Sequence, residues 1–234
     1  MAGEEWFPSD PYLERRDEPV ARPHRPIGMG DVFLGYPVIQ GAREVKKDQW
    51  RSRTAWKPDA LTMMVAHPCS ARANETGRLK DDITLAPIVP MPPGFEPPYS
   101  GYYELYPLPE LYEGRDYVAD LSKGFPCKPD FLVDKRIACM NEAALAGLLD
   151  RQARNDTRLE THHVPGHFTV EAERLRMEFD LWELWVEGTG DESGLQEWMK
   201  EEWMEGSSHL HSMRGHFEEI KKKLAEEVGV KLPE

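Results

Sequence analysis

The sequence has few cysteines and no long hydrophobic run, and both shortages narrow the class of protein. Only Cys69, Cys127 and Cys139 occur in 234 residues, too few and too far apart for a disulfide framework or a CxxC zinc knuckle. No apolar stretch approaches the ~18 residues that a membrane-spanning helix needs. The acidic, proline-broken start MAGEEWFPSD is not typical of a signal peptide. We therefore expect a cytoplasmic protein with reduced cysteines and no membrane partner.

Motifs of the common nucleotide-binding and hydrolase sites are also lacking. The chain contains no GxxxxGK[ST], GxGxxG or GxSxG pattern, so neither a phosphate-binding loop nor a nucleophile elbow is predicted. His163 and His167 have the i, i+4 spacing of a helical metal site. Pro165 and Gly166 lie between them and would break such a helix. We expect no metal and no other cofactor.

Negative charge is abundant but unevenly distributed. The formal net charge is −13, which for the chain as a whole disfavours a nucleic-acid partner. Residues 170–234 hold 17 acidic and 8 basic side chains, a net charge of −9. Residues 31–140 hold 15 acidic and 14 basic side chains, a net charge of −1. The charge therefore does not exclude nucleic acid as a partner of the first two thirds of the chain.

One segment of that part, residues 41–57 (GAREVKKDQWRSRTAWK), is basic and contains two tryptophans. Its charge is +4. Lysine and arginine bind backbone phosphates and aromatic rings stack on unpaired bases, so a nucleic-acid-binding loop is one interpretation. An ordinary solvated loop is the other. The candidate nucleic-acid-binding residues are Arg43, Lys46, Lys47, Trp50, Arg51, Arg53, Trp56 and Lys57.

Hydrophobic patterning predicts a mainly β fold with added helices. Short apolar runs indicate strands, and long irregular connections between them indicate a small, strongly bent sheet or barrel. The expected strands are 31–38, 61–67, 83–89, 102–108, 116–122 and 135–140. Asn141 is a suitable N-cap for the helix that follows.

The expected organisation has four parts. An irregular N-terminal arm spans residues 1–28, and a barrel with its closing helix spans 29–155. A linker covers 156–169, and an acidic helical region covers 170–234. The acidic region is either a set of ordinary solubilising helices or a mask that folds over the basic loop, which tethering would favour even if the contact were weak.

The first strands of the barrel resemble PemK/MazF-type toxins. Residues 29–41 (MGDVFLGYPVIQG) resemble the opening of that family, MMVAH its second strand and ITLAPIV its third, and the similarity extends to about residue 152. The resemblance implies an SH3-like barrel, often a homodimer, of the kind found in toxin–antitoxin systems. It also implies metal-independent endoribonuclease activity on single-stranded RNA.

Two positions depart from the pattern of that family. The resemblance places an arginine before the second strand and a threonine or serine after the third. Here Lys57 and Arg53 lie nearest the first position, and Val89 occupies the second. Valine cannot transfer a proton, and lysine lacks the planar guanidinium. His67 could serve as a general base, so the candidate catalytic residues are Arg53, Lys57 and His67, with Thr84 as a further hydroxyl.

Three functions remain open from the sequence. The first is a catalytically degenerate module that binds a protein or single-stranded nucleic acid, which the valine at position 89 favours. The second is an endoribonuclease with a diverged active site. The third is a structural subunit of a larger assembly such as a viral particle, because a fold does not by itself determine a function.

Overall fold

The computed structural model describes most of the chain. The described residues are 7–20, 25–44, 49–72, 78–97, 99, 102–157, 167–195, 197–199 and 211–232, and side chains are described outside 38–54, 68–69, 156–157, 167 and 211–215. The strands are β1 (Tyr12–Arg15), β2 (Val32–Glu44), β3 (Gln49–Met64), β4 (Ile83–Pro90), β5 (Leu105–Tyr112), β6 (Arg115–Asp120), β7 (Phe125–Cys127) and β8 (Arg136–Met140). The helices are α1 (Pro68–Ala71), α2 (Glu142–Thr157), α3 (His167–Thr189) and α5 (His211–Val228), with short 3-10 turns η1 (Leu121–Lys123) and η2 (Pro129–Phe131).

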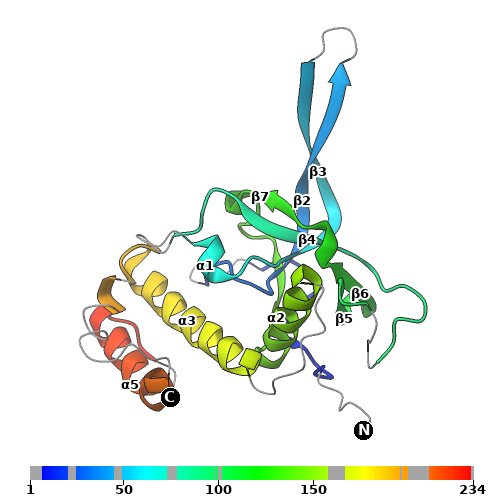
Figure 1. The fold of residues 1–234 in the computed structure, drawn as a ribbon. Coiled ribbons are helices and arrows are strands. Elements are labelled where there is room, and N and C mark those ends of the chain that lie inside the picture. The colour runs from blue at the N-terminus through cyan, green and yellow to red at the C-terminus, as the bar shows by residue number, and fades with distance from the viewer. Residues whose placement is uncertain are drawn as a thin grey trace.

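The described strands form one curled antiparallel sheet, a half-barrel with helices on one side (Figure 1). Its order is β1-β8-β2-β3-β4-β6-β5, and β7 pairs with β4. The prediction of a mainly β fold with added helices is confirmed at this level. The strand predicted at 83–89 and the strand predicted at 135–140 match β4 and β8 closely.

The two edge strands approach each other through side chains. Tyr12 in β1 donates from its hydroxyl to the carbonyl of Pro109 in β5 over 2.9 Å, and Arg15 donates to the carbonyl of Glu110 over 2.5 Å. Because β5 is an edge strand, some of its carbonyls have no ladder partner, and side chains of β1 supply donors to two of them. The N-terminal arm, which we expected to be irregular, therefore contains a strand that helps to close the sheet.

The apolar core fills the curl and extends into the C-terminal helices. It includes Val32, Met63, Tyr106 and Leu148 together with Leu175 and Phe179 of α3. A Cβ atom on Gly28 would lie 2.3 Å from Cζ of Phe179, so α3 packs directly on the segment that precedes β2. The boundaries proposed for the barrel and the acidic region stay a prediction, but the first half of α3 shares the core of the sheet.

Both ends of α2 agree in part with the sequence. Asn141 caps the helix, since its Oδ1 accepts from the backbone N–H of Ala144 over 2.9 Å. The helix continues to Thr157 and α3 begins at His167, so each helix takes up residues of the segment expected to be a linker. Arg151 on α2 donates to the carbonyls of Tyr99, Tyr102 and Leu105, which fixes the proline-rich connection before β5.

The largest difference from expectation concerns residues 41–57. We expected a loop between strands 31–38 and 61–67, but β2 and β3 continue into it and form a long two-stranded ribbon. The ribbon projects away from the rest of the molecule and twists along its length (Figure 1). The segment lacks an apolar face of period two, the usual sign of a strand, although Trp50, Thr54 and Trp56 favour extended backbone there.

Candidate nucleic-acid interface

The ribbon is defined here as residues 36–44 of β2 and 49–57 of β3. Their register is uninterrupted from the pair Tyr36–Lys57 to the pair Glu44–Gln49. At about 3.3 Å per residue, nine pairs extend about 30 Å. Residues directly across an antiparallel pair share a face, and the faces alternate along each strand. The backbone alone therefore assigns each position of the ribbon to one of two faces.

That assignment separates most of the basic residues from the tryptophans. Positions 51, 53 and 57 of β3 share one face, which we call the cation face, and they are occupied by Arg51, Arg53 and Lys57. Positions 50 and 56 belong to the opposite face, together with Arg43, which pairs with Trp50. The six described positions among the eight residues predicted to bind nucleic acid thus lie on both faces of the ribbon. Lys46 and Lys47 lie outside the described residues.

The base of the ribbon holds an exposed indole. Trp56 is 45% exposed, and a Cβ on Gly35, whose φ is +81°, would lie 2.9 Å from Cζ2 of Trp56. Only glycine accommodates both that backbone angle and that approach. The ammonium of Lys135 lies 5.8 Å from the centre of the Trp56 ring, within the range of a cation–π contact. Trp56 is therefore positioned by the body rather than by the ribbon alone.

His67 follows β3 at the opposite end of that strand. Its Nε2 donates to Oε1 of Glu171 over 3.1 Å, and the guanidinium of Arg174 also donates to the Glu171 carboxylate. Hydrogen bonds from Arg174 hold the pKa of Glu171 below its ordinary value despite partial burial, and the contact with His67 acts in the same direction. The sequence suggested neither partner, because Glu171 lies 104 positions from His67.

The candidate catalytic residues are not brought together. Lys57 and Met64 are seven residues apart in β3, and even with the bulge between Leu34 and Tyr36 in the register the separation along the strand is roughly 17 Å. Arg53 is farther from His67 still. A general base acts at hydrogen-bond distance, directly or through one water, so this set does not form an active site in the structure.

Val89 and Thr84, the two positions considered for a catalytic hydroxyl, lie near opposite ends of β4. Val89 is 41% exposed and lies near the ribbon end of the sheet, one residue beyond the pair Leu61–Ile88. Thr84 lies at the other end, where its carbonyl accepts from the amide of Val65 over 3.1 Å. The threonine therefore lies at the same end of the sheet as His67, while the position that resembles the family's hydroxyl lies at the same end as Lys57.

The described acidic helices do not cover the ribbon. In Figure 1, α3 lies between α2 and α5, and the ribbon extends away from all three. Some acidic residues of α3 form ion pairs with arginines of the same helix, as in Arg176–Asp180 and Arg174–Glu171. Within the described residues, the mask that the charge distribution suggested is not formed.

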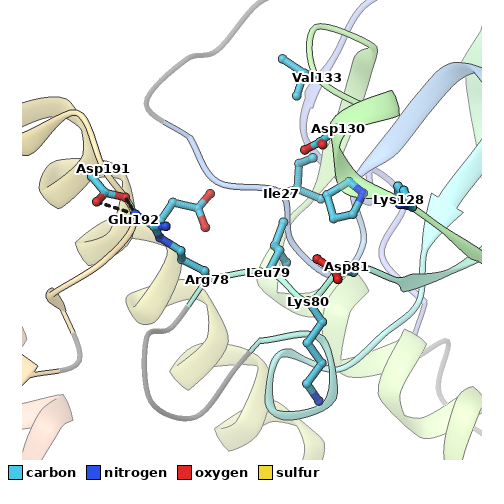
Figure 2. Close-up of a pocket in the computed structure, with 11 residues that line it drawn as sticks. Ile27, Arg78, Leu79, Lys80, Asp81, Lys128, Asp130, Val133, Asp191 and Glu192 are labelled. Atoms are coloured by element: carbon cyan, nitrogen blue, oxygen red, sulfur yellow. Dashed lines mark hydrogen bonds and ion pairs between the residues drawn. The ribbon is translucent and has the colours of Figure 1, made fainter.

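A cavity of about 350 Å³ lies next to Asp191 and Glu192, shortly after the C-terminal end of α3. Figure 2 shows Asp191 and Glu192 on one side of it and Lys128, Asp130 and Val133 on the other. Three of its seven charged lining residues form ion pairs, namely Arg78, Asp191 and Glu192. Arg78 forms two hydrogen bonds to Asp191. Hydrogen bonds from Ser193, and then those from Arg78, lower the pKa of that carboxyl to about 2. Arg72 similarly binds Glu192 over 2.9 Å, so the cavity is a junction between elements.

No family model matches the sequence, and no curated protein matches it significantly. Among the described residues, no group of three His, Cys, Asp or Glu side chains is placed to hold a metal ion. None of the helices in the described part of the chain is long and apolar enough to cross a membrane.

Proposed function

We propose that this protein is a nucleic-acid-binding module that uses the ribbon as its contact surface and does not cleave its ligand. The observation that carries the proposal is the ribbon itself, about 30 Å of paired backbone that projects from an acidic molecule while residues 41–57 keep a charge of +4. Phosphate neutralisation by lysine and arginine supplies most of the affinity in sequence-independent binding.

The curled sheet is interpreted in this proposal as an SH3-like barrel of the PemK/MazF type. Support comes from the resemblance of residues 29–152 and from the position of the ribbon between the first two strands of that resemblance. The lack of catalysis is supported by Val89 and by the separation of Lys57 from His67 along β3. Both observations are consistent with descent from a toxin that lost its catalytic residues and kept its binding surface.

The proposal is tested by shortening the ribbon. Val38 pairs with Ala55, so replacing residues 39–54 by Asn-Gly joins that pair with a two-residue hairpin turn. Fluorescence anisotropy with labelled single-stranded RNA, single-stranded DNA and duplexes should show binding by the full chain. The shortened chain should lose at least about tenfold in affinity, given the loss of several phosphate contacts.

The same samples decide the question of cleavage. Single-stranded RNA incubated with the full chain in the presence of a chelator should stay intact. Circular dichroism of the shortened chain should retain the signal of α2 and α3, because these helices pack on the body. Equal affinity of the two chains would overturn the ribbon as the interface. Metal-independent cleavage that is lost in His67→Ala would instead favour an endoribonuclease.

A further inference from the structure

The separation of cations and tryptophans onto two faces bears on the form of nucleic acid that the ribbon binds. A single strand is held in proteins by basic residues and stacking aromatics on one surface. The cation face has one aromatic position among residues 36–44 and 49–57, Tyr36, and its ring packs 5.2 Å from Phe125 in the body. That face therefore offers charge for phosphates without a platform for unpaired bases.

The spacing of the cations fits an extended row of phosphates. Arg51 and Arg53 are two residues apart on β3, about 7 Å, and Lys57 follows after about 13 Å. The positions directly across from Arg51 and Arg53 are Ala42 and Gln40. The acidic residue on this face among the paired positions is Glu44, which lies across from Gln49 at the far end of the ribbon. A row of like charges gains most from the polymer with the highest linear charge density, and duplex DNA carries one charge per about 1.7 Å of axis.

The dimensions of the ribbon also fit a groove of such a duplex. Two paired strands lie about 4.8 Å apart, and the major groove of B-form DNA, about 12 Å wide, admits a two-stranded ribbon. The major groove of an RNA duplex is too deep and narrow for this. Because the ribbon projects free of the described body (Figure 1), such a duplex would not collide with α2, α3 or α5.

We infer that the ligand of the ribbon is double-stranded DNA, with the ribbon in the major groove and the cation face against one phosphate backbone. This inference rests on the proposed function, since it requires that the ribbon be the contact surface. It assigns affinity to Arg51, Arg53 and Lys57 and predicts no stacking of bases on Trp50 or Trp56. Binding should be largely independent of sequence, because phosphates carry no base identity.

The test compares three variants of the full chain. The first, R51Q/R53Q/K57Q, removes the charge of the cation face. The second, K221Q/K222Q/K223Q, removes the same charge from α5 on the body. The third, W50L/W56L, removes the indoles of the opposite face. Each is titrated between 50 and 200 mM salt with a 20-base-pair DNA duplex, its single strand and the corresponding RNA duplex.

The inference predicts that wild type binds the DNA duplex at least about tenfold more tightly than either other ligand. The cation-face variant should lose affinity for the duplex, and its slope of log K against log salt should be shallower by about 2.7, close to 0.9 for each charge removed. The α5 variant and the tryptophan variant should keep the wild-type slope. The shortened ribbon provides an independent check if the cation-face variant proves unstable.

Other outcomes separate the two proposals. Tighter binding of single strands, with a large loss in W50L/W56L, would overturn the duplex inference and leave the ribbon as a nucleic-acid interface. An equal loss in the α5 variant would show that the effect is one of net charge and would also overturn the inference. Failure of the wild-type chain to bind any of the three ligands would overturn both proposals.

Discussion

His67 at the end of β3 donates from Nε2 to Oε1 of Glu171 on α3 over 3.1 Å. The contact joins the sheet to the acidic C-terminal helices, and Arg174 holds the same carboxylate from within α3. A histidine that the sequence suggested as a general base is thus bonded to a carboxylate of a distant helix. This relationship makes His67 a structural link between two parts of the chain.

Replacing Glu171 by glutamine should lower stability in a pH-dependent manner. The pKa of Glu171 is lowered in the folded chain, chiefly by Arg174, so its contribution is present above the ordinary value of 4.5 and is lost as pH falls through the folded pKa. We expect a loss of about 1 kcal/mol at pH 7 and a smaller loss near pH 3. The free energy of unfolding of both chains, measured in urea at pH 7 and at pH 3, tests this expectation.

Exposed Glu187 on the same helix gives the matched control. Glu187→Gln should change the free energy of unfolding by less than about 0.5 kcal/mol at either pH. A loss in Glu171→Gln that is as large at pH 3 as at pH 7 would contradict an electrostatic role for the carboxylate. It would indicate a packing effect of the substitution.

Removing the ring of Phe179 should destabilise the entire sheet. Phe179 is 6% exposed and lies in the main core with Leu175 and Val32. Phenylalanine-to-alanine changes in cores cost about 3–5 kcal/mol. We expect Phe179→Ala to lower the unfolding midpoint in one transition monitored by both far-ultraviolet circular dichroism and tryptophan fluorescence. Separate transitions for sheet and helices would contradict a shared core.

Breaking the buried ion pair between Asp31, directly before β2, and Arg136 in β8 should destabilise the fold to a similar extent. Asp31 and Arg136 are 3% and 9% exposed and lie 3.0 Å apart, and Asp31 also accepts from the amide of Gly28. Loss of one partner leaves an uncompensated buried charge, which typically costs about 3–5 kcal/mol. Asp31→Asn should therefore be strongly destabilising in urea unfolding, whereas exposed Asp130→Asn should not. Equal stability of the two variants would contradict the role of the pair.

The two cysteines whose side chains are described should resist thiol reagents in the native protein. Cys127 is 5% exposed and Cys139 is 1% exposed, and burial raises the pKa of Cys127 to about 11. Because the thiolate is the reactive form, a Cys69→Ser chain should not react with Ellman's reagent at pH 8 until it is unfolded. Rapid reaction of one equivalent of thiol in the folded chain would contradict this expectation.

How much of this structure the sequence predicts depends on how local each feature is. Asn141 caps α2, and β4 and β8 show clear apolar runs, because these features depend on neighbouring residues. The ribbon was missed because residues 41–57 are too polar for the pattern of a half-buried strand. Its two faces could have been read only once the register was known.

The candidate site shows the same limit more strongly. Lys57 and His67 are close in sequence, but extended backbone separates them along β3. Glu171 and Arg174 show the i, i+3 spacing of a helical pair, which predicts their mutual contact. Their contact with His67 depends on how α3 packs against the sheet, and such packing across 104 positions has no local signature.

Hydrogen–deuterium exchange with and without a 20-base-pair DNA duplex tests the central claim most directly. In a two-stranded ribbon about half of the backbone amides have no ladder partner, so these amides exchange rapidly unless a ligand covers them. The account predicts that the duplex slows exchange mainly in residues 36–44 and 49–57. Unchanged exchange in the ribbon, with protection confined to the segment from Val65 to Ala71 around His67, would contradict it.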